Sequence, residues 1–251
     1  MIESGSAQKY LLYAIGEIAL VVVGILIALQ INNWNEFRQT KESTKTYLQG
    51  IIEDFNDDLA TLERMEEYHM FRFYALNYIL KLSGFSELDR DIPEWTPNRY
   101  WKDPIPETYD REFLSLSFRW IHRTGALEDY NSSSIEEMSN IGLFSFINNK
   151  PLKTALKRYY KNWDWRLGSE QFQRENEWIE KWYEVFAQDG IYHYSLRDMA
   201  DPISHIEKYP YKGVILSQIT QLAFWRWQCS IILQEVAQGL ITQIEEEIEK
   251  Y

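Results

Sequence analysis

The stretch YLLYAIGEIALVVVGILIALQINNW, from Tyr10 to Trp34, decides the architecture of this 251-residue chain. Its first twenty residues carry one charge, on Glu17. As an α-helix, twenty residues reach about 30 Å, which is the thickness of the hydrocarbon core of a bilayer. We therefore predict a transmembrane helix over residues 10–34, surrounded by a lipid bilayer and preceded by a short tail over residues 1–9.

The flanks of this stretch favour an anchor over a cleaved signal peptide. Tyr10 and Tyr13 lie at one end and Trp34 at the other, and aromatic rings form the interfacial belts of membrane helices. Signal peptidase prefers small residues in an A-x-A-like pattern, and the sequence IALQINNW offers a poor site. We expect an uncleaved, single-pass anchor.

One face of the predicted membrane helix is suited to contact with another helix. At 100° per residue, Gly24 and Ala28 fall near the same line as Glu17. The two small residues let helices approach closely, and a carboxylate near mid-membrane costs about 2.5–3.5 kcal/mol, so it should face protein. The predicted oligomer interface consists of Glu17, Val21, Gly24, Ala28, Ile31 and Asn35.

Three roles are compatible with Glu17 on this face. The chain has one predicted span, so the partner is another copy or another, unidentified protein. The favoured role is a protonated carboxyl that is hydrogen-bonded across the interface. In the second, Glu17 lines a proton or ion pathway through a homo-oligomer. In the third, its side chain reaches the nearer membrane interface.

The run KYLLYAIGEIALVVVGILIALQINNWNE, Lys9 to Glu36, resembles the signature YAIGEIxLVxxGIxIALQINNWNE of a bacterial protein family. Its members are single-pass membrane proteins, typical of Bacteroidota and catalogued as a domain of unknown function. A weaker resemblance continues at YNSSSIEEMSNIGLFSFINNKPLKTALKRYY, Tyr130 to Tyr160. The family has no established activity, so the resemblance implies no catalytic residues.

The charges on either side of the span bear on orientation. Only Lys9 precedes it, whereas Arg38, Lys41 and Lys45 follow, and this count alone would place the large domain in the cytoplasm. Family members usually begin with a basic segment, which is missing here or lies upstream of Met1, and which implies the reverse. We follow the family and expect a bacterial inner (cytoplasmic) membrane protein whose large C-terminal domain is periplasmic.

Residues 35–84 are expected to continue the membrane helix as a stalk, with Gly50 as a position for a bend. Apolar residues at 4-3-4-3 spacing form a seam that can pair between copies as a coiled coil or pack within its own bundle. The seam consists of Leu48, Ile52, Phe55, Leu59 and Leu62. Charges on the other face include Glu53, Asp54, Asp57 and Asp58.

The rest of the chain predicts an all-α fold with an antiparallel helical bundle. Prolines and aromatic residues mark a loop over 85–109, and residues 110–251 form an acidic helical bundle domain. Few stretches alternate at period two, so no sheet is expected. The expected helices cover about 111–122, 127–139, Asn149 (as the cap, with Pro151 in the first turn) to Gln188, and 214–250, with 189–212 irregular.

Composition limits the classes of function. The formal net charge is −12, which disfavours nucleic acid as a partner. Anionic lipid head groups also repel an acidic surface, so the soluble part is not expected to lie flat on a membrane. The single cysteine, Cys229, allows neither an intramolecular disulfide nor a thiolate metal cluster. It lies in an apolar helix, where a buried and inert thiol is expected.

Several residues have types that can carry chemistry, but their patterns are weak. Glu66-x-x-His69 has the spacing of a di-iron ligand pair, but no second pair exists, so a solvated or core-edge His69 is expected. The group Asp189, His193, Asp198, Asp201 and His205 matches no known metal pattern, and turn and capping roles are favoured. Core positions are expected for Trp163, Trp165, Trp178, Trp182, Trp225 and Trp227.

The sequence therefore predicts no catalytic, cofactor or metal site and no cofactor. It predicts a membrane-anchored protein that is not an enzyme and that is homo-oligomeric through its transmembrane and stalk helices. Its expected role is interaction, scaffolding or sensing. The alternative is a homo-oligomeric ion or proton pathway lined by Glu17, which a Glu17→Gln variant would separate from the first role.

Overall fold

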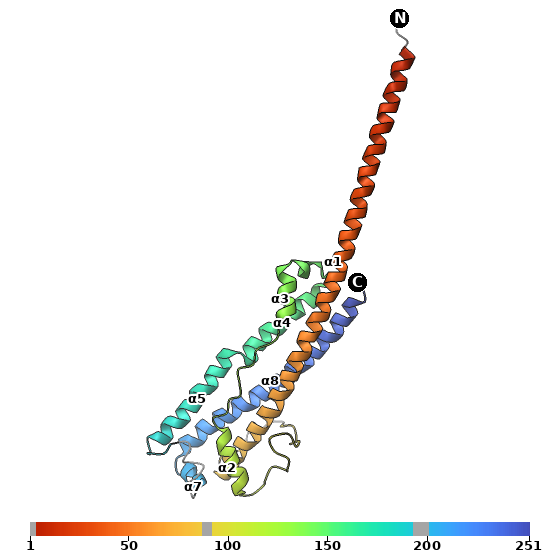
Figure 1. The fold of residues 1–251 in the computed structure, drawn as a ribbon. Helices are drawn as coiled ribbons and strands as arrows, with labels where there is room; N and C mark the ends of the chain where they lie inside the picture. The colour runs from red at the N-terminus through yellow and green to blue at the C-terminus, as the bar shows by residue number, and fades with distance from the viewer. Residues whose placement is uncertain (1–3, 87–91, 193–200) are drawn as a thin grey trace.

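The computed structural model describes residues 4–86, 92–192 and 201–251, with side chains from Leu11 onward. The predicted all-α class is confirmed, because these residues form helices and no strand. The helices are α1 (Ser4–Leu82), α2 (Arg111–Trp120), α3 (Ser133–Asn140), the 3-10 helix η1 (Leu143–Phe146), α4 (Lys150–Leu167), α5 (Ser169–Ala187), α7 (Pro202–Glu207) and α8 (Pro210–Ile248). Figure 1 shows that the first half of α1 projects as a bare helix and that the other helices pack around its second half.

α1 is one unbroken helix of 79 residues, which corresponds to about 120 Å at 1.5 Å per residue. All residues from Leu11 to Trp34 are exposed, and the first buried residue is Thr44. Within the described chain, α1 is the helix that is long and apolar enough to cross a membrane. The expected bend at Gly50 is absent. A Cβ there would lie 2.8 Å from Ser134 Oγ, so glycine allows the loop before α3 and its first turn to approach α1 closely.

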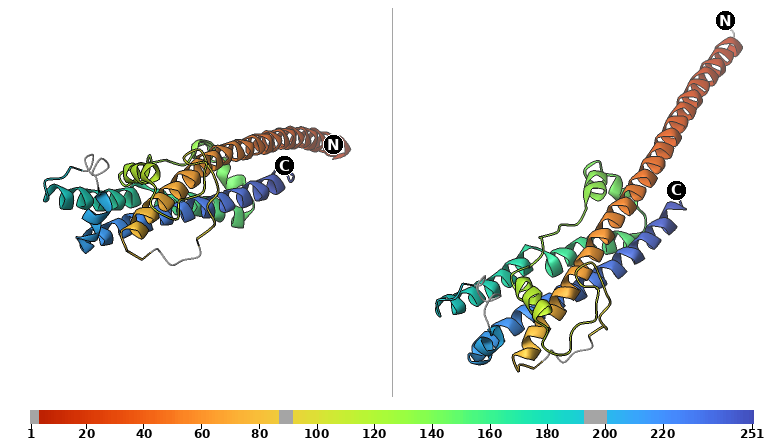
Figure 2. Two further views of the ribbon diagram at one scale, coloured as in Figure 1. Left: turned by 90° about the horizontal axis from the view of Figure 1, so that it is seen from below. Right: turned by 60° about the horizontal axis from the view of Figure 1, so that its bottom comes forward.

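The apolar seam of α1 packs within its own bundle. Leu48, Phe55 and Leu62 are fully buried, and α8 runs antiparallel alongside this half of α1 (Figures 1 and 2). The expectation that the acidic residues lie on an outer face is wrong for Asp54 and Asp58, which are both buried. The reason is tertiary: the loop before α3, α3 itself and α4 cover the second side of α1.

The bundle has two apolar cores along α1. The core nearer the bare helix joins α1, α3, α4 and the C-terminal half of α8, and includes Leu48, Phe55, Leu156, Tyr159 and Leu240. The distal core joins the end of α1 to α2, α5, α7 and the start of α8, and includes Phe71, Phe113, Trp182, Ile219 and Phe224. Each core combines residues from distant parts of the sequence, so α1 and α8 act as the shared spine.

The expected helix from Asn149 to Gln188 is two helices. The start is as predicted, because Asn149 Oδ1 accepts a hydrogen bond of 3.1 Å from Leu152 N. The helix is interrupted at Gly168, where ψ is −176° and the backbone is extended. A Cβ on Gly168 would lie 2.3 Å from the carbonyl oxygen of Asp164, so only glycine fits this junction.

Two other helices begin elsewhere than expected. Residues 127–132 are not helical, and α3 begins at Ser133, after the Asn131 amide has bonded to Asp58 on α1. α8 begins at Pro210 rather than near residue 214. Proline suits a first helical turn because its φ is already helical and it lacks the amide that would have no acceptor.

The aromatic loop packs partly through its own residues. Trp95 Nε1 donates to the carbonyl oxygen of Asp103 at 3.0 Å, and Trp101 Nε1 donates to that of Pro104 at 3.2 Å. It also packs on the helices, since the ring of Trp101 lies 4.9 Å from that of Phe113 on α2. The loop therefore closes the distal core at the lower end of the bundle (Figure 2).

Candidate functional site

The predicted contact face of α1 lies entirely outside the bundle. Glu17 is exposed, and the exposed fractions of Val21 and Ile31 are 57% and 61%. A Cβ added to Gly24 would have no atom within 4 Å. Glu17 has neither a hydrogen bond nor an ion pair with any described part of the chain. The helix places Glu17, Val21, Gly24, Ala28, Ile31 and Asn35 along one side, as the spacing predicted, and contributes nothing that covers them.

The anchors predicted at the two ends of this segment are also uncovered. Tyr13 is 78% exposed and Trp34 is 64% exposed. The side chain of Tyr10 lies outside the described residues. Just beyond Trp34, the guanidinium of Arg38 lies 5.7 Å from the Trp34 ring centroid and donates to Asn35 Oδ1 at 3.5 Å. Asn35 is therefore half-buried by side chains of its own helix. It lies at the boundary between the apolar and the polar parts of α1.

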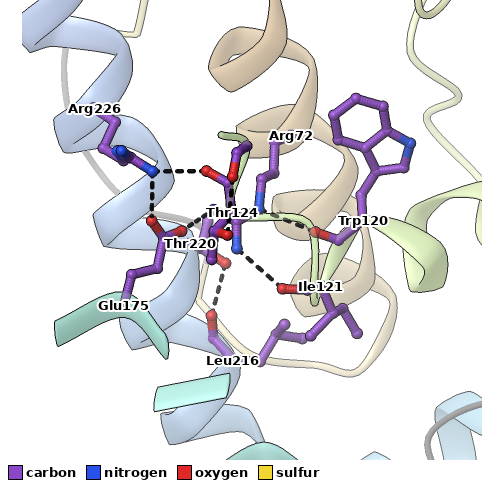
Figure 3. Close-up of polar contacts among 9 residues, drawn as sticks. Arg72, Trp120, Ile121, Thr124, Glu175, Leu216, Thr220 and Arg226 are labelled. Carbon is purple, nitrogen blue, oxygen red and sulfur yellow. Dashed lines mark hydrogen bonds and ion pairs between the residues drawn. The ribbon is translucent and has the colours of Figure 1, made fainter. Parts of the chain in front are cut away.

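A buried polar cluster, which the sequence did not reveal, lies in the centre of the bundle (Figure 3). Glu175 from α5 is fully buried between Arg72 on α1 and Arg226 on α8. Arg72 Nη1 donates to Glu175 Oε1, and Arg226 Nη1 donates to Glu175 Oε2 at 3.2 Å. Arg226 Nη1 also donates to the carbonyl oxygen of Thr124 at 2.7 Å. One carboxylate thus joins three helices that are far apart in the sequence.

Arg72 also closes the C-terminal end of α2. Its Nε and Nη2 donate, each at 3.0 Å, to the carbonyl oxygens of Trp120 and Ile121. These carbonyls are at the helix end, where no amide of the same helix can reach them. Burial lowers the pKa of Arg72 to about 9 and that of Arg226 to about 10, so both groups stay cationic at neutral pH. The cluster holds two cations and one anion, which is an arrangement for holding helices together.

His69 lies beside this cluster. Its partner in the di-iron spacing, Glu66, accepts a hydrogen bond of 2.7 Å from Gln234 on α8. His69 is 1% exposed, so the expectation of a solvated or core-edge position is wrong. Burial, followed by the charges of Arg226 and Arg72, holds the pKa of His69 well below its usual value. The described chain contains no group of three His, Cys, Asp or Glu side chains that could hold a metal.

The Asp/His-rich segment forms an ion pair around a lysine. Lys212, which is fully buried, donates to Asp189 Oδ2 at 2.6 Å and lies 2.8 Å from His205 Nε2. Its ammonium occupies the position among these donors that a metal would need. The hydrogen bond from Lys212 lowers the pKa of Asp189, and burial lowers the pKa of His205. Asp201 caps α7, as the favoured capping role predicts. His193 and Asp198 lie outside the described residues.

The tryptophans divide between core and surface. Trp163, Trp182 and Trp227 are buried, as expected, and Trp178 is half-buried. Trp165 and Trp225 depart from the core expectation, because they are 55% and 36% exposed and form an edge-to-face pair with ring centroids 5.8 Å apart. Cys229 is buried, in agreement with an inert thiol.

Two buried carboxylates of α1 are further residues whose role the sequence did not show. Asp58 accepts hydrogen bonds from Asn131 N at 2.7 Å and from Tyr159 Oη at 2.8 Å. Asp54 accepts from Ser134 N at 2.8 Å, in the first turn of α3, where a carboxylate is favoured. Burial raises the pKa of Asp58 to about 6. The sequence signal for these buried carboxylates was that both stand next to apolar seam positions. Their partners could not be predicted, because they lie more than 70 residues away along the chain.

Comparison with known proteins supports the family resemblance in part. No curated protein and no solved structure matches the chain. Residues 17–84 match the model of a family of unknown function, DUF6090. The match begins inside the apolar segment and ends two residues after α1. The longer signature and the bacterial group expected from the sequence stay predictions. The chain is therefore similar to this family along the helix that connects the exposed apolar segment to the bundle core.

Proposed function

We propose that this protein is anchored in a membrane by the apolar half of α1, assembles with copies of itself there, and acts as a scaffold or sensor through its bundle without catalysis. The observation that carries the proposal is the continuity of α1. The same helix is bare from Leu11 to Trp34 and forms the centre of the bundle from Leu48 to Leu80. Bare apolar surface of this length is unfavourable in water and favourable in lipid.

In the proposed sensor, the continuous helix couples the two halves of the protein. No loop or glycine break separates the apolar half from the half that carries both cores and the buried Arg72–Glu175 pair. A shift of α1 in the membrane, caused by assembly, must therefore move or strain the packing of α8 and α5. A two-state response of this kind is the physical basis of sensing across an interface.

Self-association is proposed through the exposed half of α1 only. The stalk seam is already occupied by α8, so it does not provide a second contact between copies. The face with Glu17, Gly24 and Ala28 combines a carboxylate that needs a partner with two small residues that permit close helix approach. A second copy of the same face supplies both.

The test compares two variants of the full chain in detergent by native mass spectrometry. Gly24→Leu adds bulk where the two backbones should meet and is expected to reduce the oligomeric fraction strongly. Leu26→Ile lies roughly 160° from Gly24 around the helix and is expected to leave it unchanged. A monomeric parent, or a Gly24→Leu variant that assembles like the parent, would refute self-association through this face.

The second candidate function is a proton or ion pathway through such an oligomer. The observation that favours it is Glu17, an exposed carboxylate in the otherwise apolar stretch of α1 from Leu11 to Leu29. In liposomes, Glu17→Gln should abolish proton flux if the pathway exists. If Glu17 serves the assembly alone, the parent shows no flux, and the variant retains the oligomer because a glutamine can still hydrogen-bond across the interface.

The proposed orientation places the bundle in the periplasm of a bacterial inner-membrane protein. Its support is the basic lead typical of the resembling family, against the basic residues Arg38, Lys41 and Lys45 that follow the span here. A C-terminal alkaline phosphatase fusion should then be active, and a C-terminal fluorescent-protein fusion should be dark. The opposite pair of results would place the bundle in the cytoplasm.

A further inference from the structure

A basic cleft lies at the end of the bundle from which bare α1 emerges. The cleft has a volume of about 320 Å³ and is formed by η1 and the first two turns of α4. Its lining consists of Phe144, Lys150, Lys153, Thr154 and Lys157. The ammonium of Lys157 lies 5.4 Å from the ring centroid of Phe144, which therefore forms an apolar wall beside the cations.

The lysines of this basic cleft have no carboxylate partner within the described part of the chain. No ion pair of the described chain includes Lys150, Lys153 or Lys157. The segment from Lys150 to Trp163 also contains Arg158 and Lys161 and no carboxylate, although the whole chain has a net charge of −12. Three cations around one cleft, within an acidic protein, create a local potential that favours an anionic ligand.

The Lys150 end of the cleft lies close to the membrane surface in the proposed topology. Asn149, next to Lys150, donates to Glu247 at 3.2 Å, and Lys41 on α1 donates to the carbonyl oxygen of Lys250 at 3.4 Å. Lys150 is therefore near the level of Lys41 to Lys45 along α1. At 1.5 Å per residue, this level is about 10–17 Å beyond Trp34. Head groups extend about 5–8 Å beyond the hydrocarbon core, and a lysine stem can reach toward them.

Apolar side chains accompany the cations at this end of the bundle. Ile141, which precedes η1, and Phe146, the last residue of η1, are 55% and 48% exposed. A second cavity of about 180 Å³ brings Phe146 together with Phe37 and Lys41 on α1. Exposed aromatic and aliphatic groups next to lysines are the composition of surfaces that contact the interfacial region of a bilayer.

We propose that the basic cleft binds the phosphate of anionic phospholipid head groups in the bilayer that holds α1. The inference rests on the proposed membrane anchoring and adds the chemistry of the lipid. The proposal also corrects the expectation that the acidic bundle stays away from anionic lipids. The end of the bundle with the basic cleft is positively charged, although the net charge of the chain is negative. Binding here would fix the tilt of the bundle on the membrane.

The test uses the full chain in nanodiscs of phosphatidylcholine alone and of phosphatidylcholine with phosphatidylglycerol. Hydrogen exchange of peptides covering residues 143–157 is the readout, and native mass spectrometry counts the lipids retained. Two variants with the same change of charge are compared. The test variant is Lys150→Gln, Lys153→Gln and Lys157→Gln, and the control at the distal end is Lys102→Gln, Lys181→Gln and Lys208→Gln.

Phosphatidylglycerol should protect residues 143–157 in the parent and in the control variant, and not in the test variant. From the usual contribution of a lysine near an anionic membrane, the test variant should bind this lipid on the order of 100-fold more weakly, about five-fold for each lysine. Equal protection in both nanodiscs would overturn the proposal. So would protection by inorganic phosphate alone in detergent, which would identify a soluble ligand.

Failure of the anchoring proposal gives a different result. If α1 does not insert, neither the parent nor the variants enter nanodiscs of any composition. If the chain inserts and the protection does not depend on the lipid, anchoring stands and the lipid site is refuted.

Discussion

Replacing Glu175 by glutamine tests whether the buried cluster holds the bundle together. Glutamine has nearly the same shape, so no cavity forms and the change is electrostatic. Its amide oxygen can accept from one guanidinium, while its NH₂ group faces the other donor. Arg72 and Arg226, which are 0% and 1% exposed, would then carry two positive charges with no compensating anion.

The expected loss of stability follows from this geometry. Removing one partner of a buried ion pair destabilises a protein by about 3–5 kcal/mol, because the remaining charge is left buried without compensation. At about 2–4 °C for each kcal/mol in a domain of this size, the melting temperature of the bundle should fall by about 6–20 °C. The free end of α2 should loosen as well, since Arg72 also holds the carbonyls of Trp120 and Ile121.

The assay is thermal unfolding of the detergent-solubilised full chain, followed by far-UV circular dichroism. The matched control is Glu177→Gln, because Glu177 lies on the same helix and is exposed. The control should change the free energy of unfolding by less than about 0.5 kcal/mol, as is usual for surface positions.

A double variant provides the second part of this test. Adding Arg226→Met to Glu175→Gln removes one of the two uncompensated cations and should recover part of the lost stability, with a coupling of at least about 1 kcal/mol. The reasoning is refuted if Glu175→Gln unfolds within 1 kcal/mol of the parent, or if the two substitutions are simply additive.

Burial and packing give further predictions. Because its native pKa lies well below 6.5, His69 stays neutral in the fold and is protonated only in the unfolded chain, so stability should fall by about 1.4 kcal/mol per pH unit as the pH drops below 6.5. His69→Gln should flatten this slope in thermal scans, and an unchanged slope would contradict the assignment. Asp58 should change stability with pH in the opposite direction, since its native pKa of about 6 exceeds the usual 3.8. The contribution of Asp58 to the free energy of unfolding should rise by up to about 3 kcal/mol as the pH falls from 6 to below 4. The Asp58→Asn variant should lose this pH dependence. Gly168→Ala should cost about 1–3 kcal/mol, because its Cβ meets the Asp164 carbonyl. The control Gly239→Ala, with open space in an exposed helix, should gain about 0.5–1 kcal/mol in denaturant titrations.

Local sequence signals predicted the helices whose causes are local. The apolar run from Leu11 to Leu29, the cap at Asn149 and the proline in the next turn act within a few residues, and the structure contains them. Local sequence signals gave the wrong helix boundaries where packing against a distant segment determines the backbone. The break at Gly168 and the extended chain before Ser133 depend on the packing of α3, α4 and α5 against α1 and α8.

The same distinction holds for the candidate sites. The face with Glu17, Gly24 and Ala28 could be predicted because helical periodicity alone places these residues together. The Arg72–Glu175–Arg226 cluster could not, because its members are separated by 103 and 51 residues along the chain. Arginine within the apolar runs around Arg72 and Arg226 was a weak signal of burial, and Glu175 lies in a polar segment that gave none.

By itself, the sequence determined the all-α class, the long apolar helix near the N-terminus and the face that this helix presents. These depend on hydrophobicity and on a period of 3.6 residues, which are properties of single segments. Only the tertiary structure decided that the seam of α1 is filled by α8, that Asp54 and Asp58 are buried, and that Arg72, Glu175 and Arg226 from distant helices become partners. Burial is a property of what covers a residue, and the covering helices come from elsewhere in the chain.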